Sequence, residues 1–237
     1  MKVFESALSS FLGVFLSPRQ KSLFSKYLDL LLEWNKKINL TSITDTEEIW
    51  FKHFLDSLTC LRVIRPAPLI SIVDIGTGAG FPGIPLKIML PGVDLLLVES
   101  VEKKSGFCQF IVENLKLDHV TVLNARAETV GSDCRYREHF DWAVSRAVAS
   151  LPVLAEYQLP LVKPGGSALA MKGDISENEI RSSETAFKIL GGHLEKIDTF
   201  YLPGNFGKRT IIEIRKSKKT PEKYPRRIGV PSKKPLA

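Results

Sequence analysis

The sequence has little of what would anchor a protein in a membrane, join it by disulfides or hold a metal ion. No uninterrupted apolar run approaches the roughly 20 residues that a membrane-spanning helix needs. The three cysteines are odd in number and include no C-x-x-C pair, and the four histidines are scattered, without an H-E-x-x-H motif. These absences predict a cytoplasmic protein with reduced cysteines, no membrane segment and no metal site.

The N-terminus resembles a weak signal peptide, with Lys2 ahead of an apolar run at residues 11–16. Glu5 and the lack of a small-x-small cleavage site argue against such a peptide. We therefore expect an amphipathic helix at the start of the chain.

The charge is unevenly distributed over a chain whose composition is otherwise that of a globular protein. Hydrophobic residues make up 44% and charged residues 25% of the 237 positions, and the formal net charge is +7. Residues 208–237 hold eleven Lys or Arg against two Glu, so the rest of the chain is slightly acidic. Such a run is either a solvated tail or the electrostatic footprint of a polyanion-binding protein, and an active site upstream would favour the second reading.

Residues 1–65 are predicted to be a helical region. Ser17 can cap a helix that begins at Pro18, and apolar residues follow at helical spacing. Thr44, with Glu47 three residues on, predicts the start of a second helix. The aromatic residues of this region are expected to form core.

After a break at Arg65-Pro66-Ala67-Pro68, residues 66–215 alternate short apolar runs with helix-length segments. This alternation predicts an α/β fold with a parallel sheet and helices on both faces. The candidate strands are residues 69–74, 94–99, 120–124, 141–145, 167–172, 193–201 and 209–215. We expect the last two to pair as an antiparallel hairpin.

Residues 216–237 have a proline every few positions and almost no apolar content. Segments of this composition bury too little surface to fold alone, so we expect an extended, mobile tail unless a partner orders it. The chain is thus predicted to have three parts, at residues 1–65, 66–215 and 216–237.

The most informative segment, residues 69–90, runs from an apolar strand ending in Asp74 through a glycine-rich loop into a helix. The loop glycines are Gly76, Gly78, Gly80 and Gly83. Glycines are needed where the backbone turns sharply and approaches a ligand closely. Nineteen residues after Gly80, Glu99 ends the next strand, where a carboxylate can accept hydrogen bonds from both ribose hydroxyls of a nucleoside. The pattern indicates a nucleoside-cofactor site.

Two cofactor classes compete for this loop, because residues 78–83 also satisfy the dinucleotide pattern G-x-G-x-x-G. A dinucleotide needs backbone N–H groups at the helix start to hold its pyrophosphate, and Pro82 and Pro85 remove two of them. S-adenosylmethionine has no phosphate and its sulfonium is cationic, so the loss of anion-binding donors costs it nothing. Asp74 and Glu99 add acidic character that suits its cationic amino-acid moiety. The loop favours S-adenosylmethionine, with a dinucleotide-dependent oxidoreductase and a catalytically idle RNA-binding protein as the alternatives.

Two motifs of other methyltransferase chemistries are missing. There is no Pro-Cys pair for attack on a pyrimidine ring carbon, and no Asn-Pro-Pro-aromatic or Asp-Pro-Pro-aromatic segment for an exocyclic amine. The acceptor should therefore be intrinsically nucleophilic. N7 of guanine fits, because its lone pair is free and its methylation releases no proton, so that positioning rather than a general base would supply the rate.

Several short segments together carry a family resemblance. They are Trp34-Asn35, Asn39-Leu40-Thr41, His53 with Asp56-Ser57, DIGTGAGFPGIPL at residues 74–86, Glu99-Ser100, Lys103-Lys104, Ala127-Glu128, Ser145-Arg146-Ala147 and Lys172-Gly173. With these segments the chain resembles, from about Trp34 to Leu236, the bacterial 16S ribosomal RNA guanine-N7 methyltransferases, also called the glucose-inhibited division protein B family.

The resemblance implies a class I S-adenosylmethionine-dependent methyltransferase fold, a Rossmann-like sheet of seven strands with the last one antiparallel. It implies methyl transfer from S-adenosylmethionine to a guanine N7 in the decoding-region hairpin of 16S ribosomal RNA. The partner would be that RNA or a precursor of the small ribosomal subunit, and no protein partner is inferred. The cofactor site would include Gly76, Gly78, Gly80, Phe81, Glu99, Ser100, Ala127, Glu128 and Arg146.

Three residues are candidates for the chemical step. By resemblance Arg146 lies beside the methyl donor, at the carboxyl end of the fourth strand. Lys172 has the analogous place after the fifth strand and could hold an RNA phosphate, while His53 is either structural or RNA-positioning, with Asp56 able to orient it. The family usually has arginine where this chain has Lys52, which offers only a point charge to a phosphate. We expect the basic tail to bind RNA and cofactor binding to be independent of it.

Overall fold

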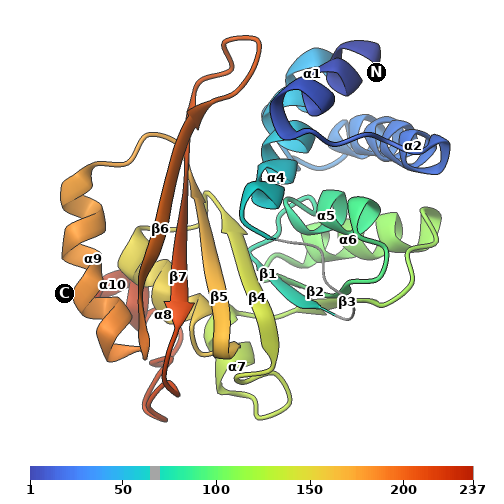
Figure 1. The fold of residues 1–237 in the computed structure, drawn as a ribbon. Coiled ribbons are helices and arrows are strands. Elements are labelled where there is room, and N and C mark those ends of the chain that lie inside the picture. The colour runs from blue at the N-terminus through green and yellow to red at the C-terminus, as the bar shows by residue number, and fades with distance from the viewer. Residues whose placement is uncertain (65–69, 237) are drawn as a thin grey trace.

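Alternating apolar runs build one sheet of seven strands in the computed structural model, which describes residues 1–64 and 70–236 (Figure 1). The helices are α1 (Lys2–Leu12), α2 (Pro18–Asn35), α3 (Thr46–Ile49), the π-helix η1 (Trp50–Leu55), α4 (Asp56–Leu58), the 3₁₀-helix η2 (Thr59–Arg62), α5 (Gly83–Met89), α6 (Glu102–Asn114), α7 (Ala127–Ser132), α8 (Leu151–Gln158), α9 (Glu177–Ile189) and α10 (Val230–Lys233). The strands are β1 (Ser71–Ile75), β2 (Asp94–Glu99), β3 (Val120–Asn124), β4 (Phe140–Arg146), β5 (Val162–Lys172), β6 (Gly192–Tyr201) and β7 (Lys208–Lys216).

The strand order is β3-β2-β1-β4-β5-β7-β6. The first five strands are parallel, and β7 runs antiparallel to both β5 and β6. The predicted fold class and the predicted closing hairpin are therefore confirmed. The chain passes from β1 to β2 on one side of β1 and later returns to β4 on its other side. Ligands of open α/β sheets bind at the carboxyl ends of the strands where the strand order switches in this way, which here are β1 and β4.

The first strand is shifted slightly from its predicted position, since β1 covers Ser71–Ile75. Its expected beginning at Leu69 and the expected break at residues 65–68 lie outside the described residues. The other strands begin and end within three residues of their predicted bounds, except that β5 begins five residues earlier, at Val162.

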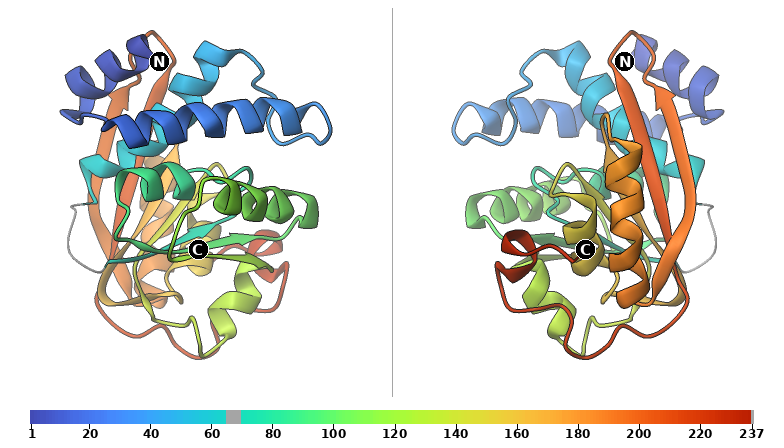
Figure 2. Two further views of the ribbon diagram at one scale, coloured as in Figure 1. Left: turned by 90° about the vertical axis from the view of Figure 1, so that its right-hand side faces the viewer. Right: turned by 90° about the vertical axis from the view of Figure 1, so that its left-hand side faces the viewer.

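The sheet has a hydrophobic core on each face. The N-terminal helices pack with α5 and α6 over one face, where Phe24, Tyr27 and Phe54 are fully buried, and α7, α8 and α9 cover the other (Figure 2). The aromatic residues of the N-terminal region thus form core, as predicted, and the chain begins with the expected helix, which buries Phe4 and Leu8.

The two helix starts expected near the N-terminus have different outcomes. Ser17 caps α2 in a reciprocal capping box with Gln20, which confirms the first. The second was placed one residue too early, because Asp45, not Thr44, caps α3 and accepts a hydrogen bond from the Glu48 N–H at 2.9 Å. A carboxylate at that position reaches the third helical amide, which is the usual geometry of an N-cap.

The C-terminal segment, residues 217–236, is held against the body of the protein, so the prediction of a mobile tail was wrong. Arg137 donates hydrogen bonds to three of its backbone carbonyls, including that of Tyr224 at 2.7 Å. Arg226 forms an ion pair with the buried Glu156 at 2.6 Å. Polar side chains far away in the sequence order this segment, and its local composition gave no sign of them.

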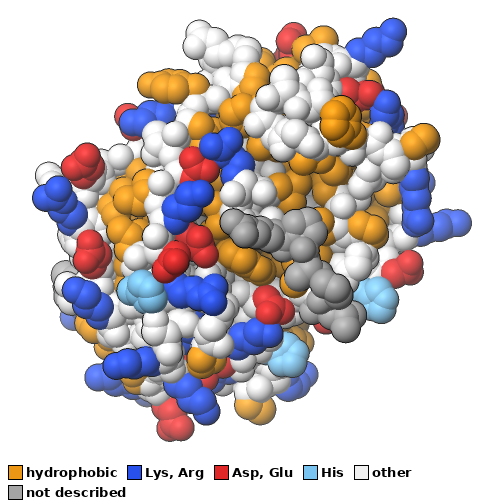
Figure 3. All heavy atoms as spheres, in the orientation of Figure 1, with side chains coloured by type: hydrophobic (Ala, Val, Ile, Leu, Met, Phe, Trp, Pro, Cys, Tyr) orange, Lys and Arg blue, Asp and Glu red, His pale blue; other side chains and the backbone are white. Residues whose placement is uncertain are grey.

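The described surface mixes apolar and charged side chains of both signs, as Figure 3 shows for one face. None of the helices that the structure describes is long and apolar enough to cross a bilayer. Cys60, Cys108 and Cys134 are free thiols. Burial raises the pKa of Cys60 and of Cys108 above the ordinary range, which keeps both thiols protonated at neutral pH.

Candidate functional site

The loop after β1 depends on its glycines for two different reasons. A Cβ on Gly76 would lie 2.8 Å from the Val148 side chain, and one on Gly80 would lie 2.5 Å from the Tyr27 hydroxyl oxygen. A Cβ on Gly78 would meet only a backbone oxygen at 4.0 Å, but its φ of +62° is one that other residues rarely adopt. Two glycines are thus required by packing, while Gly78 faces open space where a ligand can approach the backbone.

Asp74 turns beneath the loop rather than towards a ligand. Its Oδ2 accepts hydrogen bonds from the Thr77 hydroxyl at 2.6 Å and from the Gly83 N–H at 2.8 Å. The residue is fully buried, Oδ1 has no hydrogen-bond partner among the described residues, and burial raises the pKa of the carboxyl group to about 7. Asp74 lines none of the cavities beside the loop, because its carboxylate accepts from the Thr77 hydroxyl of the loop and from the backbone of α5. That its acidic character suits a cationic amino-acid moiety stays a prediction.

The beginning of α5 has no donors to offer a pyrophosphate. The Gly83 N–H donates to Asp74, and the Ile84 N–H donates to the Gly80 carbonyl at 2.9 Å. Pro85 has no N–H. The structure therefore supports the sequence argument against a dinucleotide and extends it, since hydrogen bonds within the protein occupy the donors that the prolines leave.

Glu99 links the glycine loop to the end of β2. It is 6% exposed, its Oε2 accepts from the Gly78 N–H at 2.9 Å, and its Oε1 accepts from the Val101 N–H at 2.8 Å. Each carboxylate oxygen can accept a second hydrogen bond. Glu99 can therefore shape the loop and still accept hydrogen bonds from the hydroxyls of a bound ribose.

Three neighbouring cavities lie beside the carboxyl ends of the parallel strands. The glycine-loop cavity, of about 410 Å³, is lined by Gly76, Gly78, Phe81, Glu99, Ser100, His53 and Arg146 among others. The α7 cavity, of about 80 Å³, is lined by Ala127, Glu128 and Tyr157 and shares Gly76, Ser100 and Val148 with the first. The β4–β5 cavity, of about 320 Å³, includes Lys52, Asp56, Lys172 and Arg209 and shares His53, Arg146 and Ala147 with the first. Of the predicted site residues only Gly80 lines none of the three, because it packs against Tyr27 behind the loop.

Arg146 forms the wall between the glycine-loop cavity and the β4–β5 cavity. Its NH1 donates to Asp56 Oδ2 at 3.1 Å and to the Lys52 carbonyl of the π-helix η1 at 3.0 Å. Its NH2 lies 3.1 Å from Nδ1 of His53, and the guanidinium carbon lies 5.0 Å from the centre of the Phe81 ring. These contacts hold a side chain that is only 14% exposed in one position.

The contacts of His53 determine its protonation. Because a guanidinium can only donate, Nδ1 must accept from Arg146, and the ring proton must lie on Nε2, which is 2.8 Å from the Thr41 hydroxyl oxygen. The ring stacks on Phe81 with 4.7 Å between centroids. Burial first, and then the charge of Arg146, lower the pKa of His53 to about 3. At neutral pH the imidazole is uncharged and both of its nitrogens are engaged, so it has no free lone pair with which to take a proton.

Lys172 points into the protein rather than freely into solvent. Its Nζ donates to the Ala149 carbonyl at 2.6 Å and lies 3.5 Å from Glu179, and its side chain is 16% exposed. It thereby supports the loop after β4, in which Ala147 has a φ of +54°, a conformation rare for alanine. A phosphate-binding role for Lys172 stays a prediction.

Sequence reasoning missed several residues of this network. Asp56 was expected to be able to orient His53. It instead bridges Arg146 and Arg209, and the Nε atom of Arg209 lies 3.0 Å from Asp56 Oδ1. Thr41 belongs to a segment that carried the family resemblance, which was a usable signal. Two other residues carried no signal in the sequence that pointed to this network. They are Arg209, which lies in a predicted strand, and Tyr27, which was predicted to form core.

The structure shows no cluster of three or more His, Cys, Asp or Glu side chains able to hold a metal ion within residues 1–64 and 70–236. The site thus consists of a buried carboxylate, a glycine loop, and an arginine–histidine pair stacked on Phe81. This combination can hold a nucleoside and position a second group beside it.

Two solved structures align with about 70% of this chain at low sequence identity. M. jannaschii TYW2, solved in complex with AdoMet, aligns with a TM-score of 0.55 and 13% identity over 69% of this chain and 76% of its own. The YcgJ protein from Bacillus subtilis aligns with a TM-score of 0.54 and 12% identity over 70% of this chain and 100% of its own. These likenesses support the fold alone.

Comparison of the sequence with those of known proteins is more specific. The chain is 50% identical over 224 residues to the ribosomal RNA small subunit methyltransferase G of Acetivibrio thermocellus, which covers 94% of this chain and 92% of the relative. It is 44% identical to the protein of the same name from Leuconostoc citreum, over 100% of this chain and 99% of the relative. The family model described as GidB, rRNA small subunit methyltransferase G, matches residues 20–210. The chain therefore belongs to the rRNA small subunit methyltransferase G family.

Proposed function

We propose that this chain transfers a methyl group from S-adenosylmethionine to N7 of a guanine in the decoding-region hairpin of 16S ribosomal RNA. The observation that carries the proposal is the common wall of the glycine-loop and β4–β5 cavities. A methyl donor in the first cavity and an acceptor base in the second would meet at that wall. The macromolecular partner is the RNA itself or a precursor of the small ribosomal subunit.

The residues around the glycine-loop cavity suit the proposed cofactor. When bound, S-adenosylmethionine supplies a methyl group attached to a cationic sulfonium. Gly76 and Gly78 would let it approach the backbone, with Ser100 beside them, while Glu99 would accept hydrogen bonds from its ribose. The adenine would lie in the adjoining α7 cavity, between Ala127 and Glu128. Gly80 would act indirectly, by letting the loop pack against α2.

On the acceptor side, the site offers fixed donors and no free base. A guanidinium donates well to the O6 atom of guanine, so Arg146 can orient the base while N7 stays free to attack. Since N7 carries no proton, the reaction needs alignment and exclusion of water, which the packed Arg146, His53 and Phe81 provide. His53 is proposed to position Arg146 and the base, and Lys52 and Lys172 to receive RNA phosphates.

The test is transfer of labelled methyl groups to small ribosomal subunits, and to their naked RNA, from cells that lack this protein. N7-methylguanine is mapped by its susceptibility to reduction and strand cleavage. We expect one new site, in the decoding-region hairpin. Methylation of another atom, or none on either substrate, would contradict the proposal.

A variant pair sharpens this test. Arg146→Ala should lower kcat by more than about tenfold, because the orienting donor is removed. The control Arg135→Ala removes an arginine whose side chain is 73% exposed and whose guanidinium contacts Asp133 and the Tyr136 ring, both within two residues of it. It should leave kcat unchanged. Equal activity of the two variants would remove Arg146 from the reaction.

The alternatives give different results in binding and transfer assays. Calorimetry that showed affinity for NAD and none for S-adenosylmethionine would favour an oxidoreductase. RNA binding without methyl transfer, by a protein that binds neither cofactor, would favour an idle RNA-binding protein.

A further inference from the structure

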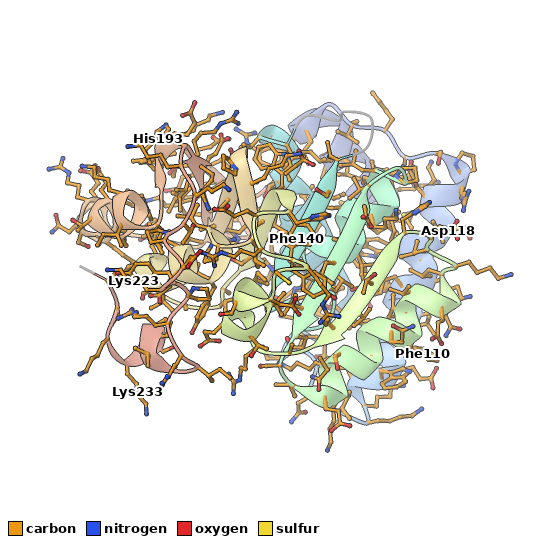
Figure 4. All side chains as sticks on the ribbon, turned by 90° about the horizontal axis from the view of Figure 1, so that it is seen from below. Phe110, Asp118, Phe140, His193, Lys223 and Lys233 are labelled. Atoms are coloured by element: carbon orange, nitrogen blue, oxygen red, sulfur yellow. The ribbon has the colours of Figure 1, made fainter. Side chains whose placement is uncertain are left out.

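The C-terminal segment (residues 217–236) crosses the side of the molecule that carries α7 and α8, and Figure 4 shows Lys223 and Lys233 projecting outward from it. Its first residues are fixed to the sheet. The ammonium group of Lys216, at the end of β7, donates to the Leu159 carbonyl at 2.5 Å and to the Thr220 hydroxyl at 2.6 Å. This anchoring determines where the rest of the segment begins.

The middle of the segment is fixed by a buried ion pair. Glu156, on α8, is fully buried, and Arg226 reaches it with its backbone N–H at 2.8 Å, with Nε at 2.9 Å and with NH2 at 2.6 Å. Charge-assisted, bidentate contacts of this kind define the position of the backbone as well as of the side chain. The residues after Arg226 therefore reach α7 and α8 from a defined point.

Those residues contact the wall of the α7 cavity. The Gly229 N–H donates to Glu128 Oε1 at 2.9 Å, and the Ser232 hydroxyl lies 2.9 Å from that of Tyr157. Glu128 is 5% exposed and Tyr157 is 9% exposed, and both line the cavity. Gly229 has a φ of +78°, a left-handed conformation that glycine adopts without strain and that aims this N–H at the carboxylate.

We infer that residues 228–232 are a positioning element of the cofactor site. Gly229 holds one carboxylate oxygen of Glu128, so that the other oxygen is aimed at the exocyclic amino group of adenine. The segment that composition describes as an RNA-binding tail thus acts in cofactor recognition. This inference rests on the proposed placement of the adenine in the α7 cavity, and it reverses the expectation that cofactor binding is independent of the tail.

A truncation after Arg227 tests the inference, because it removes Gly229 and α10 while keeping the Arg226–Glu156 ion pair. The matched control is the full-length double variant Lys233→Ala/Lys234→Ala, which loses the same two exposed positive charges. Calorimetry would measure the affinity of each protein for S-adenosylhomocysteine and for S-inosylhomocysteine. The second ligand has a carbonyl oxygen where adenine has its amino group.

The unaltered protein should prefer S-adenosylhomocysteine by about tenfold or more, the value of one hydrogen bond to a charged group. The truncated protein should lose most of that preference, through weaker binding of the adenine ligand and little change for the inosine ligand. The control should keep it. A preference retained by a folded truncated protein, or an equal weakening for both ligands, would overturn the inference.

A second variant answers the question if the truncated chain does not fold. Gly229→Val in the full chain disfavours the left-handed backbone that aims the N–H at Glu128, and it should erase the preference in the same way. If the unaltered protein binds both ligands equally, Glu128 does not recognise the amino group and the inference fails while the cofactor site stands. If it binds neither, the proposed cofactor placement itself fails.

Discussion

Glu99 has two tasks at the residue scale, since it accepts hydrogen bonds from the loop backbone and is proposed to accept others from the ribose. We predict that Glu99→Ala weakens S-adenosylmethionine binding by at least about tenfold, because hydrogen bonds to a charged group contribute about 1.5–3 kcal/mol each. Glu99→Gln keeps one acceptor oxygen and should lose less. Calorimetry would measure both, with the exposed Glu102→Ala as control. Unchanged affinity of Glu99→Ala would exclude Glu99 from the site.

His53 makes a prediction about pH at the same scale. Its pKa of about 3 lies far below the range from pH 6.5 to 8.5, so its charge does not change there. Single-turnover rates should therefore be nearly flat across this range, and His53→Ala should lower the rate without changing the shape of the profile.

Two other pH profiles would have distinct meanings. A steep limb abolished by His53→Ala would make His53 a base and point to an acceptor that must lose a proton. A change of rate with pH could also persist in His53→Ala and disappear in Asp74→Asn. Such a pH dependence would come from the buried Asp74 carboxyl, whose pKa is raised to about 7.

At the scale of elements, α2 supports the glycine loop from behind. The Tyr27 hydroxyl donates to the Ala79 carbonyl, and the Tyr27 ring stacks on Phe81 with 5.5 Å between centroids. Tyr27→Phe leaves that carbonyl without its donor, so the free energy of unfolding should fall by about 1–3 kcal/mol. Cofactor affinity should fall with it, because the loop loses its brace.

Denaturant titration and calorimetry would measure these two effects. Tyr201→Phe is the matched control, since it makes the same change in a side chain that is 70% exposed. If Tyr27→Phe proved as stable as the control and bound the cofactor as tightly, α2 would contribute to the hydrophobic core but would not support the glycine loop.

At the scale of the whole molecule, the C-terminal segment can be ordered and still present charge to RNA. Six of its cationic side chains are exposed: Lys218, Lys219, Lys223, Arg227, Lys233 and Lys234. Replacing Lys218, Lys219 and Lys223 with glutamine should weaken the salt dependence of RNA binding. The slope of the logarithm of the binding constant against the logarithm of the salt concentration should become shallower by about 0.7–0.9 for each RNA phosphate that is no longer neutralised. Filter binding across a salt series would measure it.

The control for this charge effect removes three cations elsewhere, with Arg181, Lys188 and Lys196 replaced by glutamine on α9 and β6. Both variants change the net charge equally, so a difference between them would locate the RNA. Equal slopes would mean that the segment attracts RNA only through the net positive charge of the protein and not through contacts with phosphates.

The sequence by itself determined the order and type of most elements, the glycine loop and the family. These depend on residues close together in the chain. Apolar periodicity defined β2 and β3, the capping box at Ser17 marked the start of α2, and the prolines after Gly80 argued against a dinucleotide. Each of these signals lies within a few residues, which is why it could be interpreted without a structure.

Only the tertiary structure decided which residues of the site contact one another. Arg146 meets His53 across 93 positions of sequence, Gly229 meets Glu128 across 101, and Asp74 turns inward because the backbone of its own loop needs an acceptor. The partner of a buried polar group is set by which elements pack together. Composition could therefore suggest that the C-terminal segment is mobile, whereas ion pairs and hydrogen bonds to distant residues hold it against the cavity proposed for the adenine.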